Sequence, residues 1–309
     1  MREFSGTLAF AALLMAMLLW GSSFVAFKYA VQTYDPFVII FSRMVLATLM
    51  FALSFRIWKP TRIKRKDLPT IFFMALCEPC LYFIFEGQAL TLTTASQAGM
   101  VSATLPLLVA VAAWFCLDET LTPRSWIGLV LALAGVTWVS VSGQSTETAP
   151  NPGLGNFLEF LGMVCAAGYT ISMKKLCATY SPWFMTAVQA AVGVVFFFPF
   201  LFLPSTTLPT SFPWEPTVAV LYLGLCISIG AYGFYNFGIS KLPAWQASAF
   251  INLIPVFSII LGWFCLDEHL TLSQLCGAGI VFLGVVLSQE RHPDATEPDE
   301  ALPERAPAS

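Results

Sequence analysis

Long apolar segments recur along nearly the whole chain, and each is close to the 20 or so residues that an α-helix needs to cross a bilayer. They lie at 7–30, 37–56, 69–90, 95–116, 125–142, 156–175, 183–203, 216–238, 244–265 and 273–289. Segments such as 105–117 are apolar without the alternation that a membrane barrel with a polar lumen requires. The pattern predicts an all-α membrane protein with ten transmembrane helices.

Composition agrees with lipid as the main solvent. Hydrophobic residues make up 57% of the chain and charged residues 11%, whereas about a quarter of an ordinary soluble domain is charged. The net charge of -3 does not indicate the basic surface that binds nucleic acid. The first segment is too long for a signal peptide and lacks a small-residue cleavage site, so we expect it to stay as a helix.

The second half of the chain repeats the first. Shifting the sequence by 149 positions aligns 95–136 with 244–285 without a gap and gives fifteen identities in forty-two positions, including Trp-Phe-Cys-Leu-Asp-Glu at 114–119 and 263–268. A shift of 146 aligns Lys28 with Lys174. We predict a five-helix repeat at 1–142, an external linker at 143–155, a second repeat at 156–289 and a disordered cytoplasmic tail at 290–309.

Five helices per repeat is an odd number, so the second repeat has to enter the membrane from the opposite face. With the N-terminus inside the cell, thirteen of the fifteen Lys and Arg residues fall on the cytoplasmic side. The two others, Lys28 and Arg43, lie inside apolar segments. The positive-inside rule therefore predicts that both termini are cytoplasmic.

Three sets of residues resemble a known family. They are Trp20-Gly21-Ser22-Ser23-Phe24 in the first segment, Arg43 in the second, and Leu-Asp-Glu-x-Leu-Thr at 117–122 and 266–271, each preceded by a proline at 106 or 255. Over about residues 8–288 the chain resembles the EamA-type permeases of the drug/metabolite transporter superfamily. The resemblance implies two inverted five-helix repeats around a central cavity, a bacterial inner membrane location, and transport of small organic solutes such as amino acids.

Charged side chains inside a bilayer are costly and mark functional sites by default. Arg43 and Glu86 lie at a similar depth and are predicted to pair, and Glu78, near the middle of its segment, is the better candidate for a carboxyl that exchanges protons. A helix-packing role for each of them is the alternative. Proton coupling and uncoupled facilitation both remain open.

Polar and aromatic residues inside the segments are the other candidates for lining a cavity. Tyr82 and Glu86 are four residues apart, as are Tyr232 and Asn236, so each pair shares one helix face. Bonds between helices and anchoring at the membrane interface are the alternatives. The candidate substrate-binding set is Trp20, Ser23, Arg43, Glu78, Tyr82, Glu86, Tyr232, Tyr235, Asn236 and Asn252.

The repeated motifs favour structural roles. Pro106 and Pro255 are predicted to kink their helices at mid-span, with or without a part in gating. The acidic pairs at 118–119 and 267–268 are expected to cap the helices that follow them. Glycines at 128, 135, 277 and 279 suit either close packing within one chain or a homodimer contact.

No motif for a cofactor, metal or nucleotide stands out. Cys77 and Cys80 have the spacing of a redox pair but lie in an apolar segment, and His269 and His292 have no partner at metal-ligand spacing. A membrane enzyme and a sensor are disfavoured, because no catalytic constellation and no sizeable soluble domain is present. The expected partners are the lipid bilayer, a small solute and, as an open alternative, protons, and the leading hypothesis is a secondary transporter, most simply an exporter.

Overall fold

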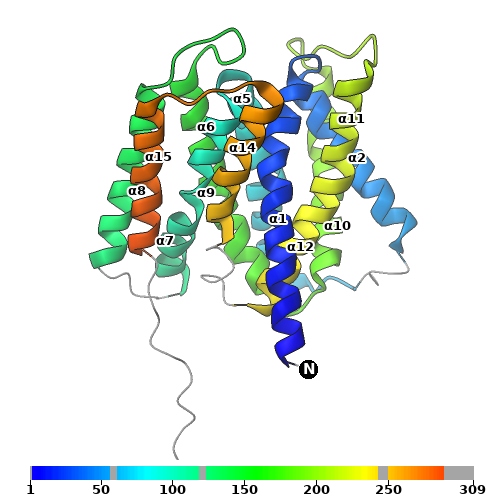
Figure 1. Cartoon of the computed structure of the whole chain (residues 1–309). Coiled ribbons are helices and arrows are strands. Elements are labelled where there is room, and N and C mark those ends of the chain that lie inside the picture. The colour runs from blue at the N-terminus through cyan, green and yellow to red at the C-terminus, as the bar shows by residue number, and fades with distance from the viewer. Residues whose placement is uncertain (1, 56–60, 118–122, 243–249, 289–309) are drawn as a thin grey trace, which may run out of the picture.

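The computed structural model describes residues 2–55, 61–117, 123–242 and 250–288, and every regular element in these ranges is a helix (Figure 1). The first half contains α1 (Arg2–Val31), α2 (Pro36–Leu53), η1 (Arg65–Asp67), α4 (Leu68–Ala75), η2 (Leu76–Leu81), α5 (Tyr82–Leu92), α6 (Ala95–Ser102), α7 (Leu105–Leu117) and α8 (Pro123–Val141).

The second half contains α9 (Pro152–Leu176), α10 (Pro182–Phe197), η3 (Phe198–Phe202), α11 (Trp214–Tyr222), η4 (Leu223–Ala231), α12 (Tyr232–Lys241), η5 (Phe250–Leu253), α14 (Ile254–Leu266) and α15 (Leu272–Ser288). Several elements join end to end, which leaves seven helical segments long and apolar enough to span a membrane and three shorter apolar ones within the described residues. These ten segments coincide with the ten that the sequence predicts.

The two halves run in opposite directions. Figure 1 shows α1 starting and α15 ending at one end of the bundle, which we call the terminal face, while the linker between α8 and α9 lies at the other end, the linker face. Helix α1 therefore rises from the terminal face, and its counterpart α9 descends from the linker face. The inverted arrangement predicted from the odd number of spans is confirmed.

The third span of each half carries a π-helical segment at an equivalent position. Adding 149 to the bounds of η2, Leu76–Leu81, gives positions 225–230, which fall within η4, Leu223–Ala231. Within η2 the backbone of Glu78 leaves the helical region, with φ -149° and ψ 120°. Widened turns of this kind interrupt the regular helical hydrogen bonding and are frequent at functional sites. Both π-helical segments contribute a residue to the central cavity described below, Glu78 from η2 and Ile227 from η4.

Two equivalent lysines cap the ends of the third spans. Lys28 donates from Nζ to the carbonyl oxygens of Leu90 (2.8 Å) and Thr93 (2.6 Å) at the end of α5, and to that of Thr148 in the linker between α8 and α9. Lys174 donates to those of Ile239 (2.6 Å) and Leu242 (2.6 Å) at the end of α12. Positions 239 and 242 are 90 and 93 shifted by 149, so the duplication preserves both the cation and its acceptors. A positive charge suits a helix C-terminus, whose last carbonyls have no partner in their own helix.

The expected capping role of Glu268 is wrong in its target. Its carboxylate does not cap the helix that follows but accepts hydrogen bonds from Ala95 N (2.8 Å), Ser96 N (2.8 Å) and Ser96 Oγ (2.6 Å) at the start of α6, in the other half. The start of α15 is already satisfied, because Thr271 and Gln274 exchange side-chain and backbone bonds as a capping box. Residues 118–122, with the corresponding acidic pair, lie outside the described residues.

Each of the two prolines lies in the first turn of a helix that follows a break, and neither kinks a continuous helix. Pro106 is the second residue of α7, after a break at 103–104, and Pro255 is the second residue of α14, after the 3-10 turn η5. Proline is tolerated in the first turn of a helix because its missing N–H has no helical acceptor there. The prediction of a mid-span kink is therefore corrected to a helix restart at each proline.

Glycines join the fifth spans of the two halves. A Cβ on Gly135 would lie 2.7 Å from Val281 and 2.8 Å from the carbonyl oxygen of Gly277, and one on Gly284 would lie 2.5 Å from the carbonyl oxygen of Gly128. These residues let α8 and α15 approach closely within one chain, as small residues do in membrane helix pairs. Gly279 meets nothing within 4 Å.

The Glu268 contact predicts a specific loss of stability. Glu268→Ala removes all three acceptor bonds at the start of α6 and should destabilise the protein by about 1–2 kcal/mol, the range for a lost N-cap. Unfolding of purified protein in detergent measures the change. Asp267→Asn is the matched control, because that carboxyl is 93% exposed and pairs with the exposed His269, and asparagine tolerates the left-handed backbone at this position, φ 54°. Equal effects of the two substitutions would contradict the cross-repeat cap.

Candidate functional site

A small central cavity lies where the two halves meet, and it gathers most of the polar residues that the sequence singles out. It has a volume of about 40 Å³, which is room for a few waters but not for an organic solute. Eight of the ten candidate residues line it, namely Trp20, Ser23, Arg43, Glu78, Tyr82, Glu86, Tyr232 and Tyr235. The cavity therefore has to widen before it admits a solute.

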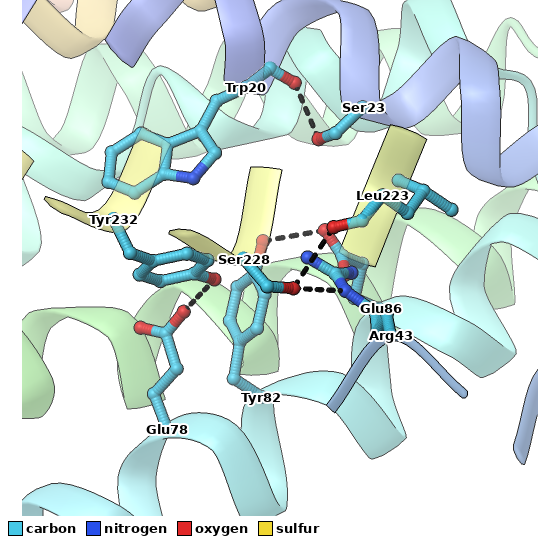
Figure 2. Close-up of polar contacts among 9 residues, drawn as sticks. All are labelled: Trp20, Ser23, Arg43, Glu78, Tyr82, Glu86, Leu223, Ser228 and Tyr232. Atoms are coloured by element: carbon cyan, nitrogen blue, oxygen red, sulfur yellow. Dashed lines mark hydrogen bonds and ion pairs between the residues drawn. The ribbon is translucent and has the colours of Figure 1, made fainter. Parts of the chain in front are cut away.

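Arg43 is held by groups from two other segments, η4 and α5. Its Nε donates to Ser228 Oγ at 3.0 Å and its Nη1 lies 3.8 Å from Glu86 Oε2 (Figure 2). Its guanidinium carbon is 4.4 Å from the centre of the Phe83 ring. The side chain is 2% exposed. The predicted pair with Glu86 is present, but its length makes the ion pair loose and leaves part of the guanidinium available to another acceptor.

Two tyrosine–glutamate pairs stand beside the arginine. Tyr82 donates to Glu86 Oε1 at 2.8 Å along one face of α5. Tyr232 donates to Glu78 Oε1 from α12, across the boundary between the halves, as Figure 2 shows. The π-helical turn at Glu78 brings this carboxyl toward the second half, so one acidic group on each of two successive segments faces the cavity.

Aromatic rings form another wall of the cavity. The ring of Trp20 lies 5.3 Å from that of Tyr232, at 74°, and 4.7 Å from that of Tyr235. Tyr169 and Phe83 each meet Tyr232 edge-on, at 6.2 and 6.3 Å. Edge-on packing of this kind fixes ring orientation, and four of these rings, those of Trp20, Tyr169, Tyr232 and Tyr235, line the cavity.

Two of the predicted residues do not line the cavity. Asn236 is fully buried behind it, where Oδ1 accepts from Tyr169 OH at 3.0 Å and Nδ2 donates to Thr186 Oγ1 at 2.9 Å. Asn252 lies in η5 and is not among the lining residues, although Ile254, two positions later, is. Ser23 does line the cavity, but its hydroxyl donates to the carbonyl of Trp20 at 2.7 Å, within its own helix.

The sequence reading missed residues from the sixth span. Tyr169, Thr170, Met163 and Ala166 of α9 line the cavity, and Ser102 comes from the end of α6. Polar residues spaced three and four apart on an otherwise apolar segment would have signalled them. Glu159, also on α9, was missed although the rule that selects intramembrane carboxyls applies to it equally.

The arrangement suits recognition rather than bond chemistry. One guanidinium and two carboxyls line the cavity beside an aromatic wall, so polar groups of both signs of charge are available there. Within the described ranges no three His, Cys, Asp or Glu side chains group as metal ligands. Cys77 and Cys80 are free and buried in η2.

The bond between Tyr232 and Glu78 gives a stability prediction. Tyr232→Phe removes one hydroxyl and leaves a buried carboxyl with one partner fewer, which should cost about 1–3 kcal/mol. Unfolding in mixed detergent micelles measures the difference. Tyr29→Phe is the control, because Tyr29 is 38% exposed on α1 and far less confined. A loss in Tyr232→Phe no larger than in the control would show that the bond contributes nothing.

The comparisons with known proteins agree with this geometry. The model of the EamA-like transporter family matches residues 7–141 and again 153–289. An uncharacterized transporter of Archaeoglobus fulgidus is 29% identical over 89% of this chain and 96% of its own length, and the uncharacterized transporter YcxC of Bacillus subtilis is 29% identical over 91% and 92%.

More distant matches extend the comparison. A probable terminal-alkyne amino-acid exporter of Streptantibioticus cattleyicolor is 22% identical over 91% of this chain and 93% of its own. A solved crystal structure superposes with a TM-score of 0.63 at 19% identity, covering 93% of this chain and 96% of the other. At that identity the superposition supports the fold alone.

Proposed function

Since this chain belongs to the EamA-like transporter family, we propose that it exports small zwitterionic metabolites of the amino-acid class by alternating access, coupled to protons. The family membership makes it a membrane transporter. The solute class, the direction and the coupling are our proposal, and the cavity composition is the observation that carries the first of them.

The cavity can bind a zwitterion because it offers a cation for the solute carboxylate and carboxyls for the solute ammonium group. Arg43 keeps donors free for a solute carboxylate, since its contact with Glu86 is loose at 3.8 Å. Glu78 and Glu86 are acceptors for a solute ammonium group, and Trp20 with Tyr235 offers apolar area to a side chain. A related protein named as a probable amino-acid exporter has the same solute chemistry.

Alternating access follows from the inverted repeat in secondary transporters, where a site near the midplane opens first to one face and then to the other. The cavity of about 40 Å³ is too small for a solute in this conformation. Equivalent lysine caps lie at opposite faces, Lys28 at the linker face and Lys174 at the terminal face. Equivalent helix ends at the two faces would allow one face to open in the outward state and the other in the inward state.

Transport in proteoliposomes tests the solute class. We expect efflux of a pool of ¹⁴C-labelled amino acids that falls about tenfold or more in Arg43→Gln, because a charge-assisted bond is worth about 1.5–3 kcal/mol. Arg43→Lys should keep part of the flux. Arg62→Gln is the control, since Arg62 is exposed outside the spans. Flux in Arg43→Gln equal to that of the wild type would show that Arg43 does not bind the solute.

Orientation is tested separately. We propose that the terminal face is cytoplasmic in a bacterial inner membrane, because nearly all basic residues outside the spans lie on that side. A C-terminal green fluorescent protein fusion should fluoresce, and an alkaline phosphatase fusion at the same place should be inactive. The opposite pair of results would reverse the proposed direction of the bundle.

A further inference from the structure

Glu159 is a buried carboxyl that the cavity description leaves unexplained. It lies on α9 with no exposed area, and neither carboxylate oxygen has a hydrogen-bond partner among the residues that the structure describes. Buried polar groups are nearly always bonded, so an orphan of this kind calls for a functional reason.

Its helical neighbours place Glu159 next to the cavity. Met163, Ala166 and Thr170 follow it at spacings of four, three and four residues, and all three line the cavity. Residues at these spacings form one stripe on a helix. Glu159 therefore continues the cavity-facing stripe of α9 by one turn toward the linker face.

A polar network lies between Glu159 and the linker face. Asn156, one turn nearer that face, accepts from Thr93 Oγ1 at 2.7 Å and donates to Gln97 Oε1 at 2.9 Å and Ser140 Oγ at 3.1 Å. These bonds are made within the protein. Glu159 thus lies between the cavity and this network, and opening of the linker face would bring water to it.

The charges around Glu159 do not balance an anion there. Helix α5 presents Glu86, whose charge repels that of Glu159, and Tyr82, which packs against α9 beside Gly162. The segment η2 brings Glu78 and Cys77, and α12 brings Tyr232 and Tyr235.

Lys28, which bonds to Thr93 of the same network, donates to the carbonyl oxygens of Leu90, Thr93 and Thr148 rather than to Glu159. Helices α4 and α6, which also pack on α9, carry no ionisable side chain, and Arg124 and Lys241 lie in the end turns of α8 and α12 at the terminal face. Arg43 is the one cation in the cavity lining and already faces Glu86. An ionised carboxylate without a partner is too costly in such a site, so Glu159 carries its proton in this conformation.

We propose that Glu159 is the proton-binding residue that couples transport to the proton gradient. When the linker face opens, the carboxylate takes a proton from external water. When the terminal face opens, the O–H bond breaks and the proton passes through the cavity to a water molecule on the other side, which leaves the carboxylate. Glu78 and Glu86 then act on the solute. This inference rests on the proposed transport function.

Two measurements on the full chain in lipid test the proposal. The first is an infrared pH titration of purified protein, which needs no solute: wild type should show a protonated-carboxyl band that is lost or reduced in Glu159→Gln and unchanged in Glu147→Gln, an exposed linker carboxyl. An unaltered band in Glu159→Gln overturns the proposal.

The second is flux of the ¹⁴C amino-acid pool in proteoliposomes. Glu159→Gln, which mimics the protonated side chain, should keep counterflow without a gradient while losing the accumulation that a pH gradient drives in wild type. Accumulation equal to wild type in Glu159→Gln overturns the proposal, and so does counterflow in wild type with no response to the gradient. Absence of both activities in wild type, with the infrared band present, would instead count against the proposed solute class.

A variant that keeps a carboxyl guards against misfolding. Glu159→Asp should retain gradient-driven accumulation with a displaced pH dependence, since the proton-binding group is kept but moved by one methylene. If Glu159→Gln does not fold, an unchanged pH profile in Glu159→Asp overturns the assignment.

Discussion

Inside a bilayer every backbone polar group needs a partner from the protein, and this constraint organises the whole bundle. The third and fourth spans of the first half are separated by a short break at 93–94, whose two helix ends carry opposite partial charges. Lys28 meets the carbonyls on one side of the break and Glu268 the N–H groups on the other. Because Glu268 comes from the second half, the bonds that satisfy the N–H groups at the start of α6 also join the two halves.

The same constraint explains why the cavity can be polar. Interruptions at η2, at 103–104 and at η5 let the chain bend around the centre, and the side chains there satisfy one another across the halves, as Tyr232 does for Glu78 and Ser228 for Arg43. The halves share their frame but differ in these residues. Because the two halves share a backbone arrangement but line the cavity with different side chains, the cavity is asymmetric, as the binding of one asymmetric solute requires.

Much of this architecture was accessible from the sequence, because the signals are physical and strong. Apolar length gave the spans, and an ungapped shift of 149 gave the inverted repeat. Pairing of Arg43 with Glu86 was predictable, since an intramembrane charge seeks its opposite at the same depth. Asn236 was misplaced because a helix face can point at a neighbouring helix as well as at a cavity, and periodicity does not distinguish them.

Other features depend on tertiary contacts that sequence spacing does not encode. The target of Glu268 is such a case: a carboxyl before a helix suggests a local cap, but Thr271 and Gln274 already fill that place and leave Glu268 free to reach α6. Glu159 shows a different limit. Its residue type was a sufficient signal, yet only the lack of a hydrogen-bond partner for both of its oxygens, among the described residues, separates it from Glu78 and Glu86, which each accept one bond.

Alternating access requires that one cavity between two inverted halves opens in turn to the two faces. Hydrogen–deuterium exchange of the protein in lipid, with and without the amino-acid pool, addresses it through two equivalent stretches, residues 90–96 at the linker face and 239–242 at the terminal face. With alternating access, protection should rise in one stretch and fall in the other when solute is added. A change of the same sign in both, or in neither, would contradict it.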